Sequence, residues 1–250
     1  MARPPKLQPF FKYIGSKYLA APHYPRPRYD IISEYFCGAG GYATRNYQKK
    51  IFLFDIDPRL IEIWRFLIAS TFESIMDLPL LAIGQDVSEL NVSGPALWFI
   101  QSCLNVGAFK ANKLCAWAPK CPGAFWGLAK RSIIARQVHL INHWEAYCCD
   151  YSQADEFLPA EPITRFIDPP YQALDQCYDS GKGPPLDYEA LGTWCRRQSG
   201  QVIVCELDGA DWLPFKYFRQ NRSGRGKHKR REVIWTNDPD RQIWLPNVEG

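Results

Sequence analysis

The sequence lacks the features that place a chain in a membrane or outside the cell. No apolar run approaches the ~20 residues of a membrane-spanning helix, and residues 1–13 contain no apolar core like that of a signal peptide. It also lacks any Cys-x-x-Cys pair, and its four histidines form no ligand-spaced cluster with the nine irregularly spaced cysteines. We therefore expect a cytoplasmic or nucleoid-associated protein that contacts no membrane, keeps its thiols reduced and binds no metal.

Positively charged residues only slightly outnumber negatively charged ones. The net charge of +4 over 250 residues permits binding to nucleic acid without demanding it. The cations concentrate in residues 219–231, which contain no acidic residue. With 46% hydrophobic residues, the chain is long enough for one α/β domain with an insertion and short for two independent domains.

Short apolar runs alternate with helical patterns along most of the chain, which is typical of a parallel sheet with crossover helices. Residues 105–127 break this alternation, because they are irregular and rich in Gly, Pro and aromatic residues, and they indicate an insertion. The last two apolar runs predict a hairpin with the basic segment at its tip. The expected strands are residues 29–36, 51–54, 145–149, 163–167, 201–206, 215–219 and 232–236, and the expected helices are residues 41–50, 59–72, 96–104, 128–142 and 187–197.

One tetrapeptide carries the most specific chemistry. Asp168-Pro169-Pro170-Tyr171 directly follows the expected strand 163–167, at the carboxyl end where open α/β sheets bind ligands. These residue types suit the methylation of a planar exocyclic amino group. That reaction requires hydrogen-bond acceptors for the amino hydrogens, because the nitrogen lone pair is delocalised into the ring. The Asp168 carboxylate and the Pro169 carbonyl, fixed by the two prolines, provide two acceptors, and Tyr171 offers a ring for stacking. The alternative is an ordinary strand-end turn.

Three further features lie at the ends of other expected strands. Gly38 and Gly40 form a Gly-rich turn that lets a cofactor approach the backbone closely. Asp55 can accept hydrogen bonds from ribose hydroxyls. Asp150 can accept from an adenine amino group, with Tyr151 beside the ring. Each has a structural alternative: a common turn for the glycines, and a solvated acid or helix cap for the two aspartates.

These features, in this order, resemble the Dam-type DNA adenine methyltransferases, the alpha class of amino methyltransferases. Residues 12–17 are similar to the family's N-terminal motif, with Ser16 in place of its second Gly, and residues 232–237 resemble a C-terminal strand of the family. Four inner motifs also match. Phe36, Gly38 and Gly40 match the family's Phe-x-Gly-x-Gly loop, and Asp55-Ile56-Asp57-Pro58 matches its Asp-Ile-Asn-Pro. Asp150-Tyr151 matches the acid–aromatic pair, and Asp168 to Tyr171 match the catalytic motif.

The resemblance implies an α/β fold with the Rossmann-like sheet of class I methyltransferases, an antiparallel C-terminal hairpin and a small inserted recognition region. The catalytic domain would comprise residues 1–95 and 137–250, and the insertion residues 96–136. The implied reaction is direct methyl transfer from S-adenosyl-L-methionine to N6 of an adenine flipped out of double-stranded DNA. The implied catalytic residues are Asp168, Pro169, Pro170 and Tyr171, and the implied cofactor-binding residues are Tyr13, Lys17, Phe36, Gly38, Gly40, Asp55, Ile56, Asp150, Tyr151 and Asp168.

Cations are expected to contact DNA phosphates, although a solvated loop is the alternative for the basic run. The expected DNA-binding residues are Lys12, Lys110, Lys113, Arg222, Arg225, Lys227, Lys229 and Arg230. The insertion is shorter than the family's recognition domain, which usually contains a DNA-reading hairpin. Adenine methylation in RNA and a non-catalytic DNA-binding subunit stay open as alternatives, as does a cognate restriction endonuclease as partner.

Overall fold

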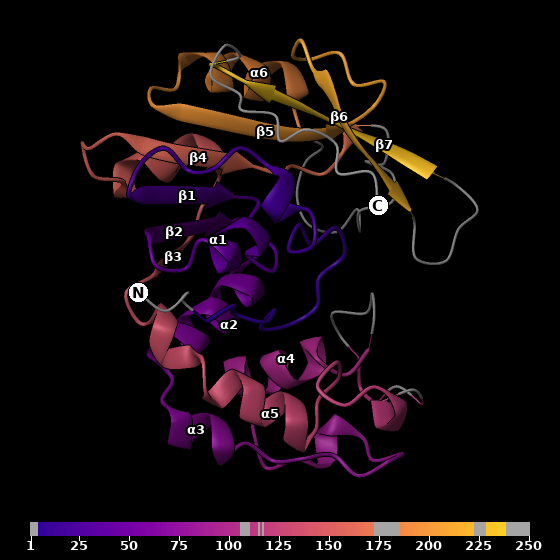
Figure 1. Ribbon diagram of the computed structural model, residues 1–250. Coiled ribbons are helices and arrows are strands. Elements are labelled where there is room, and N and C mark those ends of the chain that lie inside the picture. Colours follow the sequence, from indigo (N-terminus) through magenta and orange to yellow (C-terminus); the bar gives the residue numbers. More distant parts are fainter. Residues whose placement is uncertain are drawn as a thin grey trace.

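The computed structural model describes residues 5–105, 111–114, 116, 118–172, 186–222 and 229–238, without the side chains of residues 221, 222 and 229. Its center is a seven-stranded sheet with the order β3-β2-β1-β4-β5-β7-β6 (Figure 1). The strands are β1 Ile31–Tyr35, β2 Lys50–Asp55, β3 Glu145–Cys148, β4 Ile163–Ile167, β5 Gln201–Leu207, β6 Lys216–Arg222 and β7 Lys229–Thr236.

Strands β3, β2, β1, β4 and β5 are parallel, and β7 runs antiparallel to both β5 and β6. The prediction of a mostly parallel α/β sheet that ends in an antiparallel hairpin is therefore confirmed. Parallel strands covered on both faces consist of nearly continuous apolar residues, and β5 is buried at every position. This burial explains why the strands stand out in the sequence.

Aspartates set the starts of the two long crossover helices, α2 Pro58–Ala69 and α6 Tyr188–Arg197. Asp57 and Asp187 each accept a backbone N–H from the first turn, at 3.1 and 2.9 Å. Such caps satisfy amide groups that have no partner within the helix. Pro58 stands in the first turn of α2, where its missing N–H costs nothing.

Two helices are shorter than predicted. Helix α1, Gly41–Arg45, replaces the helix expected over residues 41–50, because the chain must turn back before it enters β2 at Lys50. Helix α5, Leu128–Ala135, ends well before residue 142, and a 3-10 turn over Val138–Ile141 follows it.

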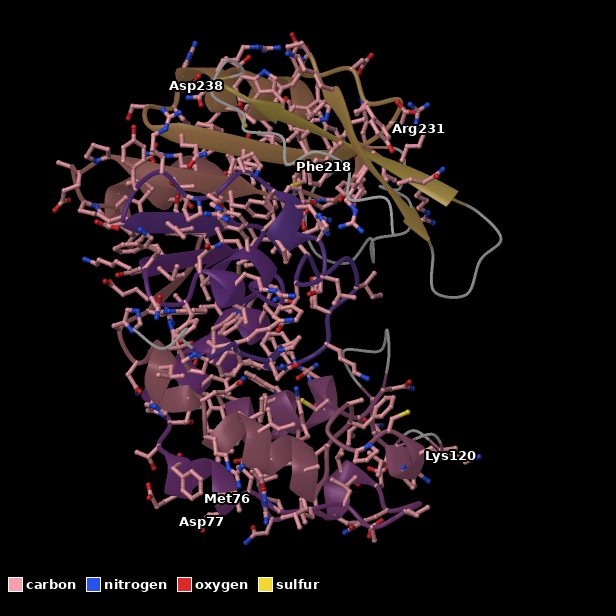
Figure 2. All side chains as sticks on the ribbon, in the orientation of Figure 1. Met76, Asp77, Lys120, Phe218, Arg231 and Asp238 are labelled. Carbon is pink, nitrogen blue, oxygen red and sulfur yellow. The ribbon has the colours of Figure 1, made fainter. Side chains whose placement is uncertain are left out.

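The chain between α2 and β3 forms a helical lobe at the end of the molecule opposite the hairpin (Figure 1). In Figure 2, Phe218 and Arg231 mark the hairpin end, and Met76, Asp77 and Lys120 mark the lobe. Helix α3 packs on α5, and α4 packs on α2. The predicted insertion over residues 96–136 lies inside this lobe, which begins earlier in the chain. Its elements are α3 Phe72–Met76, α4 Gly94–Ser102, α5, and the 3-10 turns Val87–Glu89, Ala118–Lys120 and Val138–Ile141.

Each face of the sheet carries its own apolar core. Alternate residues of β2 point to opposite faces, so Ile51 and Leu53 join one core while Phe52 and Phe54 join the other. Trp64 of α2 is fully buried in the first core. In the second core, Leu191 and Cys195 of α6 cover the sheet.

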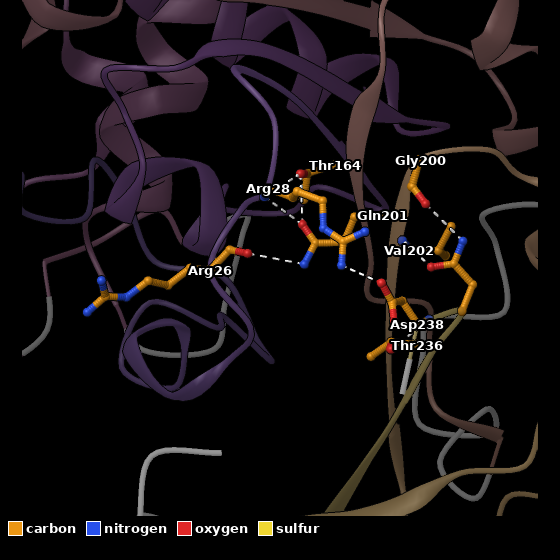
Figure 3. Close-up of polar contacts among 9 residues, drawn as sticks. Arg26, Arg28, Thr164, Gly200, Gln201, Val202, Thr236 and Asp238 are labelled. Carbon is orange, nitrogen blue, oxygen red and sulfur yellow. Dashed lines mark hydrogen bonds and ion pairs between the residues drawn. The ribbon is translucent and has the colours of Figure 1, made fainter. Parts of the chain in front are cut away.

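A polar network closes the edge of the sheet where β4 and β5 begin (Figure 3). The backbone N–H of Arg28 donates to Thr164 Oγ1 at 3.1 Å and to Gln201 Oε1 at 2.8 Å. The Arg28 guanidinium also donates to Asp238, beyond the end of β7. This network ties the segment before β1 to the sheet at the edge opposite the carboxyl ends of the parallel strands.

Among the described residues, no helix is both long and apolar enough to cross a membrane.

Candidate active site

The strand order reverses between β1 and β4. The chain runs from β1 to β2 and β3 on one side and returns to β4 on the other side of β1. Tyr35 and Ile167, the last residues of β1 and β4, pair with each other, so Phe36 and Asp168 follow at the same edge. Open α/β sheets bind ligands in the crevice at such a reversal. The predicted catalytic tetrapeptide and the Gly-rich loop therefore meet where the fold offers a ligand site.

The loop after β1 has an unusual backbone. Phe36, Gly38 and Gly40 have φ angles of +51°, +48° and +56°, in the left-handed region that non-glycine residues rarely adopt. Among the described residues, Phe36 alone of the non-glycines has a positive φ. The indole N–H of Trp64 donates to the Gly38 carbonyl at 2.9 Å and fixes the loop to α2. Backbone strain of this kind is concentrated at ligand sites.

Glu34 anchors the start of α1. Its carboxylate accepts the backbone N–H groups of Tyr42 at 3.3 Å and Ala43 at 2.7 Å, and the residue is 2% exposed. Burial raises the pKa of Glu34 to about 8, although these backbone hydrogen bonds favour the charged form. The sequence gives no sign of a role for Glu34, because its partners are backbone groups that carry no sequence signature.

Replacing Glu34 with glutamine should change how stability depends on pH. The folded protein keeps the Glu34 proton between the ordinary pKa of 4.5 and about 8, whereas the unfolded chain releases it. Wild-type stability should therefore fall as pH rises through this window, by up to about 1.4 kcal/mol per pH unit. The glutamine variant lacks this contribution, and it should be less stable at pH 5 by about 1–3 kcal/mol, because one buried N–H loses its acceptor.

Urea unfolding at pH 5, 6.5 and 8 checks this prediction. Glu62→Gln is the control, since Glu62 forms a surface ion pair with Arg65 at 2.8 Å. Parallel pH profiles for Glu34→Gln and wild type would show that Glu34 does not titrate in this range.

The N-terminal segment crosses the Gly-rich loop at close range. A β-carbon on Gly41 would lie 2.5 Å from the backbone nitrogen of Tyr18 and 2.8 Å from the carbonyl carbon of Lys17. A β-carbon on Gly38 would lie 2.8 Å from the ring of Tyr13. Glycine at both positions allows this approach, which brings Tyr13 and Lys17 to the carboxyl ends of β1 and β4.

Lys17 and Asp168 form a shielded ion pair in this crevice. Lys17 Nζ lies 2.8 Å from Asp168 Oδ1, and the two side chains are 6% and 17% exposed. Burial is the largest single influence and lowers the pKa of Lys17, but the combined attraction of Asp168, Cys205 and Glu232 exceeds it, so the pKa is raised. Burial also raises the pKa of Asp168, and the Lys17 ammonium opposes that rise. Lys17 Nζ lies 4.5 Å from the centroid of the buried Tyr171 ring, so the same cation contacts both ends of the tetrapeptide.

A second buried carboxylate holds the segment that follows the tetrapeptide. Glu206, near the end of β5, accepts the backbone N–H of Gln172 at 3.1 Å and the indole N–H of Trp212 at 3.2 Å. Burial raises its pKa, which the backbone hydrogen bonds oppose. Because Gln172 directly follows Tyr171, Glu206 holds the end of the predicted catalytic tetrapeptide. The sequence pattern predicts only the end of a strand at Glu206.

A small hollow lies between the ends of β1 and β2 and the segment after β3. It holds about 10 Å³, about the space of one water, so a larger ligand requires its side chains to move. The ring centroids of Phe36 and Tyr151 lie 5.9 Å apart, with the planes tilted by 34°. The structure thus brings four predicted cofactor residues together. The lining residues are Tyr35, Phe36, Phe54, Asp55, Ile56, Cys149 and Tyr151.

Asp55 and Asp150, two of the three carboxylates predicted to bind the cofactor, have different surroundings. Asp55 lines the hollow and accepts the backbone N–H groups of Gly38 at 3.3 Å and Asp57 at 3.0 Å. Asp150 caps the 3-10 turn Tyr151–Phe157, where one carboxylate oxygen accepts both the N–H and the hydroxyl of Ser152, at 3.0 and 2.6 Å. The capping interpretation of Asp150 is therefore present in the structure, and Tyr151 is the member of this pair that lines the hollow.

The predicted DNA-binding residues lie only partly within the described structure. Lys113 and Arg230 are exposed. Lys12 is half-buried, with Nζ 3.4 Å from the centroid of the Phe125 ring, so it joins the N-terminal segment to the helical lobe. The predictions that lie outside the described residues or side chains concern Lys110, Arg222, Arg225, Lys227 and Lys229.

Known proteins offer no assignment for this site. No protein-family model matches the chain, and no curated protein matches it in sequence. Within the part of the chain that the structure describes, no group of three or more His, Cys, Asp or Glu side chains is placed to hold a metal ion. The function must therefore be inferred from the residues of the site.

Proposed function

We propose that this protein transfers a methyl group from S-adenosyl-L-methionine to the N6 amino group of adenine in DNA. The observation that carries the proposal is the position of the tetrapeptide from Asp168 to Tyr171, at the end of β4 and beside the strained loop that follows β1. The strand order, with β7 antiparallel between β5 and β6, supports the finer assignment to the class I methyltransferase fold that the resemblance implies.

The hollow has the chemistry that a nucleoside-containing cofactor requires. The Phe36 and Tyr151 rings suit the adenine ring, and the Asp55 carboxylate at the end of β2 suits the ribose hydroxyls. When bound, S-adenosyl-L-methionine supplies an electrophilic methyl group. The side chains that line the hollow therefore match the cofactor in chemical type. The hollow itself must widen to admit a nucleoside.

The contribution of the tetrapeptide is to hold and polarise the target amino group. The Asp168 carboxylate and the Pro169 carbonyl accept its two hydrogens, which favours a pyramidal nitrogen whose lone pair is available for bonding. With the cofactor bound, the amino nitrogen would take the methyl group from the sulfonium, which leaves as a neutral thioether, and Asp168 would accept the proton that the nitrogen releases. Lys17, 2.8 Å from Asp168 Oδ1, holds this carboxylate in position.

Tyr171 has a narrower stacking role than the sequence indicates. The residue is 7% exposed, and the Lys17 ammonium lies over its ring at 4.5 Å. An entering base therefore meets Tyr171 only at the part of the ring that Lys17 leaves accessible. The target adenine must leave the duplex to reach this position, since the reacting nitrogen is inaccessible inside the base stack.

DNA is the proposed substrate because of the family resemblance and the position of the exposed cations. Lys113 belongs to the helical lobe and Arg230 to the hairpin, and these two parts lie at opposite ends of the sheet (Figure 1). A duplex that reaches the crevice between them can meet a cation on either side. Such contacts provide affinity that does not depend on sequence.

Methyl transfer from a labelled donor tests the proposal. Duplex DNA and structured RNA of mixed sequence are offered in parallel, and we expect label to enter DNA preferentially. Preferential labelling of RNA would move the assignment to an RNA adenine methyltransferase. If calorimetry detects no binding of S-adenosyl-L-methionine at millimolar concentration, a non-catalytic DNA-binding subunit becomes the better interpretation.

A further inference from the structure

The segment that carries Tyr13 and Lys17 exposes a large apolar side chain beside the crevice. Ile14 is 64% exposed, although the segment is otherwise well packed, with Phe10 and Phe11 almost completely buried. Single exposed apolar residues are common on protein surfaces, and Ile83 in the helical lobe is 80% exposed. The location of Ile14, and not its exposure alone, distinguishes it.

Ile14 lies on a turn that is hydrogen-bonded to Lys17, the residue that holds Asp168. The backbone N–H of Ser16 donates to the Tyr13 carbonyl at 3.2 Å, and Gly15 takes a φ of +84°, which favours glycine. Lys17 Nζ donates to the Gly15 carbonyl at 3.3 Å and lies 2.8 Å from Asp168 Oδ1. The carbonyl of Gly15, the residue after Ile14, is thus held by the ammonium group that holds Asp168, so the turn forms part of the rim of the crevice.

Extracting a base from a duplex leaves a space in the stack. Proteins that distort DNA insert apolar side chains, Ile among them, between base steps, and unstacking costs a few kcal/mol per step. We propose that the turn over residues 13–16 enters the DNA base stack, and that Ile14 fills the space left by the extruded adenine. This inference rests on the proposed function. Lys12, next to the turn and held against Phe125, would meet the phosphates beside the opened step.

Ile14→Ala separates this role from the methyl-transfer step. Methyl transfer is measured with mixed-sequence duplex DNA and with the same DNA heat-denatured, at substrate concentrations below KM. Only the duplex requires a base to be extruded, so we expect kcat/KM to fall roughly tenfold on duplex DNA and to stay within about twofold on denatured DNA. Ile83→Ala, the same change at an exposed site in the helical lobe, should leave both values unchanged.

Each of the other possible outcomes leads to a different conclusion. Equal loss on duplex and denatured DNA would overturn the inference, because it would place Ile14 in the support of Lys17 and Asp168. Unchanged activity on both substrates would also overturn it and leave the proposed function intact. Failure of the wild-type protein to methylate either substrate would overturn the proposed function, and this inference with it.

Discussion

Asp168→Asn is expected to lower the rate of methyl transfer to DNA by about 10²–10³-fold, the effect of removing one preorganised polar group from an active site. The amide keeps the size of the carboxylate and one acceptor for Lys17, but it removes the charge that holds and polarises the amino group. Asp168→Ala should abolish transfer. It also leaves the Lys17 ammonium, whose side chain is 6% exposed, without its carboxylate, so it should lower stability as well.

Initial rates with a labelled donor measure this effect, and thermal unfolding confirms that each variant is folded. Asp30→Asn is the matched control, because the Asp30 side chain is 94% exposed and pairs with Lys49 away from the carboxyl ends of the strands. Full activity in a folded Asp168→Asn variant would remove Asp168 from the catalytic step.

Gly41→Ala is expected to be a severely destabilising addition of a single methyl group. The new β-carbon would lie 2.5 Å from the Tyr18 nitrogen, and backbone atoms cannot move aside as a flexible side chain can. Overpacking typically costs 1–3 kcal/mol and sometimes more, so we expect a loss of about 3 kcal/mol. Displacing the segment also takes Lys17 away from Asp168, and activity should fall together with stability.

Gly127→Ala is the matched control, because a β-carbon at Gly127 meets nothing within 4 Å and its φ of 162° is extended backbone that any residue adopts. Urea unfolding and methyl transfer are measured for both variants. Equal stabilities for the two variants would show that the backbone of Lys17 and Tyr18 does not lie in close contact with Gly41.

The sheet was predictable from the sequence because buried parallel strands consist of nearly continuous apolar residues. Runs such as residues 51–54 and 201–206 end at acidic or Gly-rich positions, and each became a strand. Helix α3 and the 3-10 turn Val87–Glu89 were missed, because each is one short turn stabilised by a local capping box without apolar periodicity. The pairing of β1 with β4 joins residues far apart in the chain, which periodicity cannot reveal.

The residues of the candidate site also fall into those that the sequence predicted and those that it did not. Asp168, Lys17 and Tyr171 were expected from motifs, and the structure brings these three side chains together. Glu34 and Glu206 were missed, since each binds backbone N–H groups supplied by other segments. A buried carboxylate that holds a loop has no characteristic spacing in a sequence. Only the three-dimensional arrangement shows that two such residues support the crevice from either side.

Nucleoside analysis of DNA by mass spectrometry is the most direct test of whether this protein methylates adenine in DNA. The chain is expressed in cells whose DNA contains no methylated adenine, and the digested DNA is compared with that from cells expressing Asp168→Asn. We predict N6-methyladenine in DNA from cells with the wild-type chain and a strongly reduced amount with the variant. Methylated cytosine in place of adenine, or DNA without methylation while the folded protein is present, would contradict it.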